Sequence, residues 1–306
     1  MNVAIIGTGA VGGYYGARLA HAGHDVRFLA RSEYAHLRQH GLTVTSVDGD
    51  FSIPAGELRV YRDVVAMPEC DVVCVTVKAT ANESVLPIIW PVVKPGGLIV
   101  LLQNGFGVEQ ALATRHREAR VAAGLAFICS FRDGPGVVRH TSHGAITLAP
   151  LDGRARASVD ELAGVFEAAG VKATVMDDIV EARLRKLVWN IPFNGLTTLL
   201  GATTAELLES PAARRVATAL MKEVQAAAAA SGVAVEDEFL DQIWATTESM
   251  GDYNPSLRLD YLARRPLEVD AIYRAVIAHA GRRGATMPRT EQLADELEHL
   301  ESTYLR

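Results

Sequence analysis

Val3-Ala-Ile-Ile-Gly7-Thr-Gly9-Ala-Val-Gly12 is the stretch that decides the fold. An apolar run of strand length passes directly into the pattern G-x-G-x-x-G, and apolar residues at helical spacing continue to residue 22. Glycines between a strand and a helix permit a tight turn, a close approach of backbone to a pyrophosphate, and close helix–strand packing. The stretch predicts a dinucleotide-binding turn rather than a purely structural glycine turn. We expect the cofactor phosphates to contact Gly7, Thr8, Gly9, Ala10, Val11 and Gly12.

The second apolar run, residues 26–30, ends in residues that bear on the choice of cofactor. An NAD site places Asp or Glu about 20 residues beyond the glycine pattern, where the carboxylate binds the ribose 2′-hydroxyl. This chain has Ala30 there, followed by Arg31 and Ser32. A guanidinium and a hydroxyl would bind a 2′-phosphate, which a carboxylate would repel. These residues favour NADP(H); the alternative is that Arg31 is a solvated surface side chain.

Apolar runs and helical stretches alternate through the first half of the chain, with further strands expected at residues 72–77, 98–102 and 121–128. This alternation of strands and helices predicts a parallel sheet with helices on both faces. A turn at residues 132–136 and runs at residues 137–140 and 145–148 predict an antiparallel hairpin that closes the domain.

Only helical patterns follow from about residue 177. Thr203 and Glu206 have the spacing of a capping box at one helix start, and Ser231-Gly232 is a stop signal for the Ala-rich helix before it. The predicted fold class is α/β: a Rossmann-type NADP-binding domain over residues 1–177, then an all-helical substrate and catalytic domain over residues 178–306. Helices are expected at residues 178–199, 214–230, 236–250, 256–263, 267–282 and 288–301.

Composition excludes several classes of protein. The net charge of −6 argues against a nucleic-acid partner, and no apolar run approaches the roughly 20 residues of a membrane span. A strand that starts by Val3 leaves no room for a signal peptide, and three cysteines in apolar runs suggest buried thiols, so a cytoplasmic protein is expected. The nine histidines lack metal-ligand spacing, so no metal is expected. The Ala-rich residues 226–230 could pack within the domain or across a homodimer.

Two strand ends carry polar residues that suit the rim of a nucleotide site. Lys78 follows one apolar run and Asn104-Gly105 follows the next. Ligands of open α/β sheets bind outside the carboxyl ends of the strands. Lys78 could neutralise a phosphate or a substrate carboxylate, and Asn104 could contact the nicotinamide or the substrate. The alternatives are a solvated lysine and an Asn-Gly turn.

Lys186, Asn190 and Asn194 recur every four residues, so they share one face of a helix, here called the lysine–asparagine face. Apolar residues surround them, and a buried lysine is costly unless it is paired or functional. A desolvated lysine has a lowered pKa and could donate the proton that a ketone oxygen needs when hydride arrives at its carbon. The alternative is an amphipathic helix with a solvated polar stripe. Pro192 within the same helix predicts a kink.

Taken together, these motifs resemble the ketopantoate reductase (2-dehydropantoate 2-reductase) family over nearly the whole chain. The glycine turn, Arg31, Lys78, Asn104-Gly105 and the lysine–asparagine face stand in family order. The segment from Ser256 to Asp260 and the later Glu268 also resemble the family pattern, although each could instead serve a helix start.

The resemblance implies NADPH-dependent reduction of ketopantoate to (R)-pantoate, for pantothenate biosynthesis, in a cleft between the domains. It implies that Lys186 donates a proton to the oxygen on C2 and that Glu268 lies near both Lys186 and the cofactor. Substrate oxygens would be bound by Asn104, Asn190, Asn194 and Ser256.

The chain also departs from the family pattern. Gly195 follows Asn194 where Asn-Pro is frequent, Thr203-Thr204 replaces a frequent Asn-Gly, and Trp189 and Phe193 would make the pocket more apolar. Three functions therefore remain open: reduction of ketopantoate or another 2-oxo acid, a β-hydroxyacid-type dehydrogenase reaction, and non-catalytic NADPH sensing.

Overall fold

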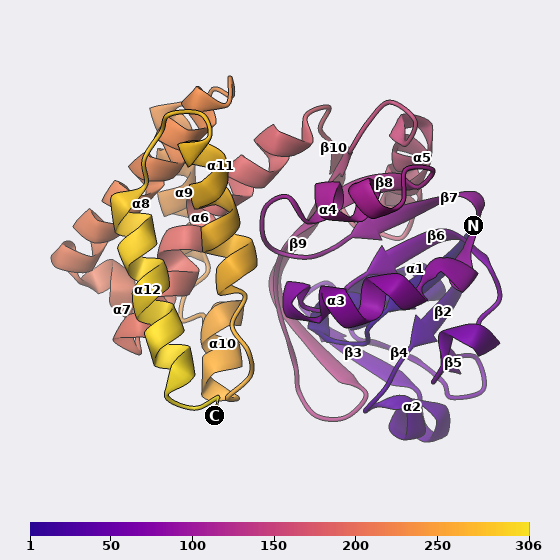
Figure 1. Cartoon of the computed structure of the whole chain (residues 1–306). Helices are drawn as coiled ribbons and strands as arrows, with labels where there is room; N and C mark the ends of the chain where they lie inside the picture. The colour runs from indigo at the N-terminus through magenta and orange to yellow at the C-terminus, as the bar shows by residue number, and fades with distance from the viewer. Residues whose placement is uncertain (306) are drawn as a thin grey trace. The chain divides into compact units, whose positions relative to one another are not determined.

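The computed structural model describes residues 1–305 and divides into two compact units (Figure 1). One unit comprises Met1–Gln103 and Val108–Ile179 and is built on a sheet; the other comprises Asn104–Gly107 and the chain from Val180, and is helical. The α/β fold class expected from the sequence is confirmed. The short segment Asn104–Gly107 follows a strand of the sheet, yet it packs with the helices.

The sheet is mixed and mostly parallel, in the strand order β4-β3-β9-β8-β7-β6-β1-β2-β5, with β10 also paired to β9. Its antiparallel pairs are β3 with β4 and β8 with β9. The strands are β1 (Asn2–Ile6), β2 (Asp25–Leu29), β3 (Leu42–Ser46), β4 (Phe51–Ile53), β5 (Arg59–Tyr61), β6 (Cys70–Val75), β7 (Val93–Leu101), β8 (Arg120–Arg132), β9 (Val137–Pro150) and β10 (Ala173–Val175).

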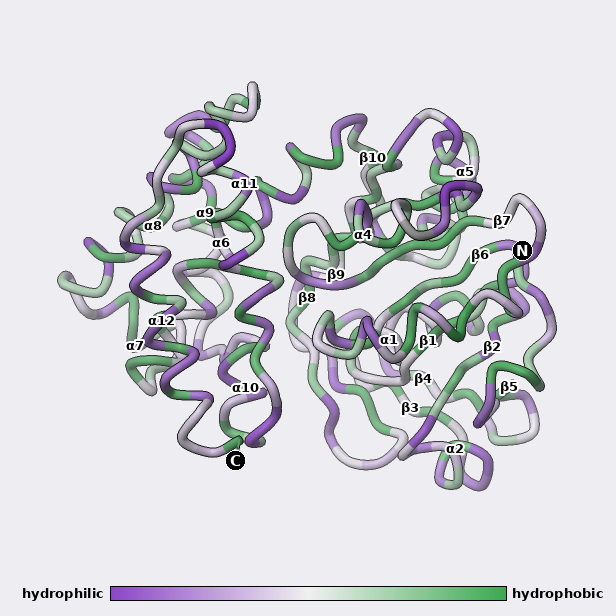
Figure 2. The backbone as a smooth tube through the Cα atoms, viewed as in Figure 1, coloured by the Kyte–Doolittle hydropathy of each residue, from purple (hydrophilic) through white to green (hydrophobic). Residues whose placement is uncertain are grey.

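Alternate residues of the central strands enter two different cores. Val3 and Ile5 of β1 pack on one face of the sheet, while Ala4 and Ile6 pack on the other. Figure 2 shows these strands as largely hydrophobic. A strand buried on both faces needs apolar residues at every position, which explains the continuous run that introduces the glycine turn. The unit's helices are α1 (Ala10–His21), α2 (Tyr34–His40), α3 (Asn82–Val85), α4 (Val108–Arg115) and α5 (Arg156–Ala168), with 3₁₀ turns η1 (Val64–Ala66), η2 (Ala79–Ala81), η3 (Leu86–Ile88) and η4 (Trp90–Val92).

The predicted hairpin within residues 137–148 is wrong. These residues form the single strand β9, which pairs with β8 around a turn that contains Gly134 and Gly136. His143 (φ 66°) and Gly144 (φ 109°) have the positive φ values of a turn. Here they accompany irregular β8–β9 register between Phe127 and Ser130 rather than a chain reversal.

The second unit contains α6 (Ile179–Leu200), α7 (Thr204–Glu209), α8 (Pro211–Ala230), α9 (Asp237–Ser249), α10 (Ser256–Leu262), a π-helical turn η5 (Asp270–Arg274), α11 (Ala275–Gly281) and α12 (Pro288–Ser302). The predicted capping box is confirmed, because the Thr203 hydroxyl accepts the Glu206 N–H and the Glu206 carboxylate accepts the Thr203 N–H. Ala227 and Ala228 are fully buried among these helices, so part of the Ala-rich face packs within the unit.

Candidate functional site

The glycine turn joins β1 to α1. Gly7 has a φ of 107°, which favours glycine, and Gly9 stands immediately before the first helical residue. The Thr76 hydroxyl at the end of β6 donates to the carbonyl oxygens of Ile6 (3.0 Å) and Gly7 (2.7 Å). Thr76 therefore fixes the turn from the neighbouring strand end, a role that no sequence motif indicates.

Gly9 and Gly12 differ in how much space surrounds them. A Cβ atom on Gly12 would collide with the Gly7 carbonyl oxygen and the Thr76 hydroxyl, whereas a Cβ atom on Gly9 would meet no heavy atom within 4 Å. Gly12 is therefore needed for packing, and Gly9 leaves open space at the start of α1. Such space beside helix N-terminal amides fits a phosphate group.

The loop after β2 carries Arg31 and Ser32, which line an open pocket with Leu29. The nearest downstream carboxylate, Glu33, is buried and forms an ion pair with Arg132. It is not among the residues that line this pocket. The pocket wall from β2 thus presents a guanidinium and a hydroxyl, the pair that suits a 2′-phosphate.

Lys78 lies in the loop between β6 and η2 and is half-buried. Gln103, at the end of β7, holds this loop: its side chain donates to the Val77 carbonyl oxygen (2.8 Å) and to the Asn82 side chain (2.6 Å). Gln103 is itself 4 % exposed. Sequence reasoning missed it, because nothing in a lone glutamine at a strand end indicates which loop it binds.

Asn104 joins the lysine–asparagine face through Asn190, whose side-chain N–H donates to the Asn104 carboxamide oxygen at 3.4 Å. The backbone beyond it is fixed on η5, because the Phe106 N–H donates to the Ala271 carbonyl oxygen (2.8 Å). A π-helical turn changes the hydrogen-bond register of a helix, and such turns are frequent at functional sites. Gly105 also packs against Ala271 and has a φ of 112°.

Gly105→Ala is expected to displace Asn104. The new Cβ atom would lie 2.7 Å from both the Cβ and the carbonyl oxygen of Ala271, in a backbone conformation that disfavours alanine. We expect the KM for a substrate bound by Asn104 to rise about tenfold or more, the effect of losing one well-positioned hydrogen bond. Steady-state kinetics check this, with Gly281→Ala, whose added Cβ meets open space, as the control. An unchanged KM would contradict the positioning role.

Lys186 lies on α6, and its side chain is half-buried. Desolvation, followed by repulsion from Arg183, lowers the pKa of its ammonium group to about 7, while the Glu268 carboxylate opposes the shift. Arg183 and Glu268 are each 2 % exposed, so the two charges that act on the pKa of Lys186 are themselves buried. Asn190 (3 % exposed) and Asn194 (1 % exposed) follow along the same helix. A solvated polar stripe does not describe this face.

Asn194 connects α6 to the start of α10. Its carboxamide oxygen accepts the Leu257 N–H at 3.1 Å and lies 3.5 Å from the Ser256 hydroxyl. Ser256 is the first residue of α10 and makes no capping bond, so its alternative role as an N-cap is wrong. Asn194 supplies the acceptor that the helix start requires, which leaves its own NH₂ group as the remaining donor.

The departures from the family pattern have local explanations. A Cβ atom at Gly195 would approach Leu293 Cδ2 (2.6 Å) and the Tyr273 hydroxyl (2.8 Å), so a larger residue there would displace the ends of these two side chains. Trp189 and Phe193 are buried and stack on each other (ring centroids 5.3 Å apart), and the Trp189 side-chain N–H donates to the Thr247 hydroxyl of α9. The Thr204 hydroxyl donates to the Gly251 carbonyl oxygen (2.8 Å) and accepts the Tyr253 N–H (3.1 Å).

Three further properties concern the part of the chain that the structure describes. Within residues 1–305, His, Cys, Asp and Glu side chains form no group of three that could hold a metal ion. No helix of these residues has the length and apolar character to span a membrane. Cys70, Cys74 and Cys129 are buried free thiols.

Comparisons with known proteins agree with this arrangement. Residues 3–153 match the family model described as "Ketopantoate reductase PanE/ApbA", and residues 178–301 match "Ketopantoate reductase PanE/ApbA C terminal". A 2-dehydropantoate 2-reductase of Nostoc sp. is 39% identical over 303 residues, covering 97% of this chain and 94% of the relative. A crystal structure of 2-dehydropantoate 2-reductase from Geobacter metallireducens superposes with a TM-score of 0.93 at 41% identity, covering 98% of this chain and 99% of the other. A ternary structure of D-mandelate dehydrogenase with NADH and anilino(oxo)acetate shares the fold (TM-score 0.90, 23% identity, 99% of each chain).

Proposed function

Because this chain belongs to the ketopantoate reductase family and is an oxidoreductase, we propose that it reduces 2-dehydropantoate (ketopantoate) to (R)-pantoate with NADPH. The observation that carries the proposal is the environment of Lys186. A lysine whose pKa lies at about 7 is partly protonated at neutral pH and can give up its proton readily. It shares a helix face with two buried carboxamides that can bind a substrate's oxygens.

Cofactor binding is proposed for the first unit. The glycine turn offers open space at Gly9 and backbone N–H groups at the start of α1 for the pyrophosphate. Arg31 and Ser32 would bind the 2′-phosphate, and Lys78 would neutralise a further anionic group. Thr8, Ala10 and Val11 complete the proposed turn, with Asn104 and Glu268 as further cofactor contacts. When bound, NADPH supplies the hydride that reduces C2 of the oxo acid.

Substrate binding and proton transfer are proposed for the helical unit. The NH₂ groups of Asn104 and Asn194 donate to carboxylate or hydroxyl oxygens, since the oxygens of both carboxamides already accept bonds within the protein. Asn190 and the Ser256 hydroxyl complete the set of polar groups. Lys186 Nζ donates its proton to the oxygen on C2 as negative charge develops there. Glu268 stabilises the protonated lysine, because its charge raises the pKa that burial lowers.

The proposal also concerns the cellular compartment in which the protein acts. Three buried free thiols suit a reducing environment, so we propose that the reaction takes place in the cytoplasm.

NADPH oxidation, followed with a panel of substrates, tests the function. We expect ketopantoate to give the highest kcat/KM among branched and unbranched 2-oxo acids. Preference for phenylglyoxylate would favour the reaction for which the D-mandelate dehydrogenase neighbour is named. Oxidation of 3-hydroxy acids with NADP⁺ would favour a β-hydroxyacid dehydrogenase. NADPH binding with no turnover of any of these compounds would favour a sensor and overturn the proposal.

A further inference from the structure

The ends of β2 and β5 bring two arginines to the same edge of the sheet. The strands are parallel neighbours, and Leu29 pairs with Tyr61. The Ala30 N–H donates to the Tyr61 carbonyl oxygen at 2.9 Å, so pairing continues to the last residue of β5. Arg31 and Arg62 are the next residues of each chain segment. Parallel strands lie about 4.8 Å apart, which places the two arginines side by side where the strands end.

Both arginines line one open pocket, whose walls differ in character. Leu29, Val64 and Ile88 supply apolar surface, and Ile88 is 46 % exposed. The remaining wall is formed by Arg31, Ser32, Arg62 and Asp63. An apolar wall beside a polar, cationic wall suits a ligand with a planar apolar ring at one end and a phosphate at the other.

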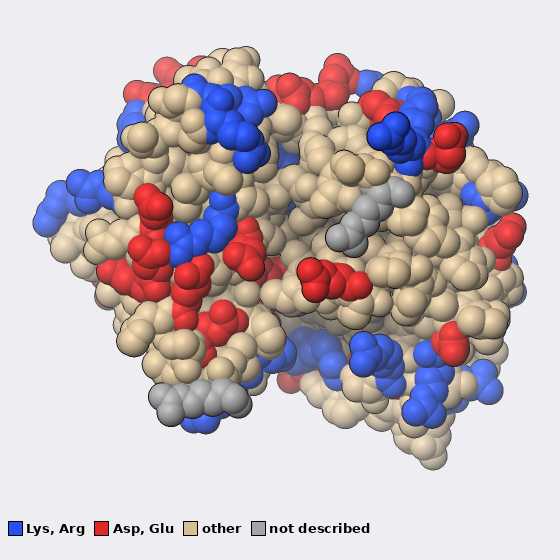
Figure 3. Space-filling model, viewed as in Figure 1, with Lys and Arg blue, Asp and Glu red and all other residues tan. Residues whose placement is uncertain are grey.

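Nearby carboxylates do not neutralise these two guanidinium groups. Among residues 1–305, neither Arg31 nor Arg62 forms an ion pair. Glu33 is paired with Arg132, and the Asp63 carboxylate accepts the Val65 N–H at 3.0 Å, as the cap of η1. Figure 3 shows Lys and Arg side chains gathered over the part of this face where Figure 1 places β5 and α2.

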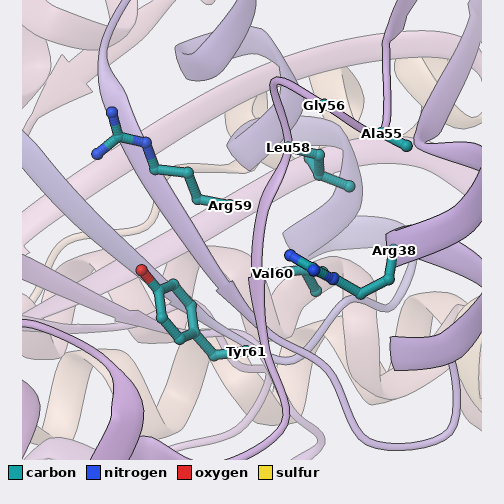
Figure 4. Close-up of a pocket in the computed structure, with 7 residues that line it drawn as sticks. All are labelled: Arg38, Ala55, Gly56, Leu58, Arg59, Val60 and Tyr61. Carbon is teal, nitrogen blue, oxygen red and sulfur yellow. The ribbon is translucent and has the colours of Figure 1, made fainter.

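A second pocket beside β5 offers a comparison (Figure 4). It also contains two arginines, Arg38 and Arg59, but their guanidinium groups lie well apart. Arg59 is bound to Asp25 at 2.8 Å, so its charge is already neutralised. The pocket of Arg31 and Arg62 is therefore the stronger anion site of the two.

We propose that Arg62 is a second ligand of the cofactor's 2′-phosphate, acting together with Arg31, so that the choice of NADP(H) over NAD(H) depends on both arginines. A dianionic phosphate can accept hydrogen bonds from two guanidinium groups at once. The adenine ring then lies against the apolar wall of the same pocket. This inference rests on the NADPH dependence in the proposed function, but not on the identity of the 2-oxo acid.

Isothermal titration calorimetry with two nucleotides that differ only in the 2′-phosphate tests the proposal: adenosine 2′,5′-bisphosphate and adenosine 5′-monophosphate. We expect Arg62→Ala to weaken binding of the bisphosphate about tenfold to a hundredfold, as for loss of a charge-assisted hydrogen bond. Binding of the monophosphate should not change. Arg31→Ala should show the same pattern. Arg62→Lys should retain part of the affinity for the bisphosphate, because a lysine keeps the positive charge but lacks the planar guanidinium group that donates two parallel hydrogen bonds.

Arg59→Ala is the matched control: it removes an arginine three residues earlier, on β5 itself, that is already bound to Asp25, and it should leave both affinities unchanged. Normal bisphosphate binding by Arg62→Ala, or equal losses for both nucleotides, would overturn the role of Arg62. Equal affinity of the wild-type protein for both nucleotides would overturn it together with the NADP(H) assignment. If the wild-type protein prefers the bisphosphate and Arg62→Ala removes that preference, the inference stands even where no 2-oxo acid is reduced.

Discussion

Lys186→Met is expected to lower kcat for ketopantoate reduction about 10²- to 10⁴-fold, the range associated with loss of a general acid. Methionine, like lysine, is unbranched and favours helices, but it has no ammonium proton to donate. Binding of NADPH should persist, since the proposed phosphate ligands lie on the other unit. The measurement is steady-state and single-turnover oxidation of NADPH at saturating ketopantoate.

The pH profile distinguishes proton donation from a structural role. Burial lowers the pKa of Lys186 to about 7, so the ammonium form predominates below that pH and is lost above it. We expect kcat/KM for reduction to be highest at acidic to neutral pH and to fall as pH rises through about 7. Lys186→Met should lose this limb of the profile along with the rate.

Lys222→Met provides the control for this substitution. Lys222 lies on α8 of the same unit, half-exposed and paired with Asp237, so the same chemical change there should leave kcat unchanged. Full activity of Lys186→Met, or an identical pH profile in that variant, would contradict the assignment of the proton donor.

Gly9→Ala is expected to abolish most NADPH binding while the protein remains folded. A Cβ atom there meets no protein atom within 4 Å, and the residue's φ of −69° is accessible to alanine. The methyl group would occupy the space proposed for the pyrophosphate and block its contacts with backbone N–H groups. Loss of two such charge-assisted bonds corresponds to roughly a hundredfold or larger rise in Kd.

Two other alanine substitutions complete that test. Gly12→Ala places its Cβ atom against the Gly7 carbonyl oxygen and Thr76, so it should lower the free energy of unfolding by about 1–3 kcal/mol as well as binding. Gly164→Ala on α5 adds a methyl group in open space and should affect neither property adversely. Calorimetric Kd values and urea unfolding separate the three outcomes. Unaltered NADPH affinity in Gly9→Ala would contradict the placement of the cofactor.

The central sheet and the helical second unit could be predicted because local sequence determines them. The runs that became β1 and β6 are mostly apolar, as burial on both faces requires, and β2 has Arg27 among its apolar residues. Strands β3, β4, β5 and β10 were missed; the last three have only three residues each, which are too few to show a period. The irregular strand β9 was predicted as two strands. A glycine with positive φ, such as Gly144, occurs both where a strand bulges and where the chain reverses, and the sequence alone does not distinguish the two cases.

The spacing of Lys186, Asn190 and Asn194 could indicate a shared helix face, because helical periodicity is local. Their partners could not be found that way. The bond from Leu257 to Asn194 joins residues 63 positions apart, and the bond between Asn190 and Asn104 spans 86. Arg62 belongs to no motif at all; it is distinguished only by the pairing of β2 with β5. The roles of these residues in catalysis and binding stay predictions.

Transfer of deuterium to ketopantoate from NADPH that carries deuterium at both hydrogens of the nicotinamide C4 tests the central claim most directly. Mass spectrometry and NMR of the product should show pantoate with one deuterium at C2, formed rapidly by the wild-type protein and about 10²- to 10⁴-fold more slowly by Lys186→Met. Pantoate without deuterium at C2, or no product from ketopantoate or any other 2-oxo acid, would contradict the account.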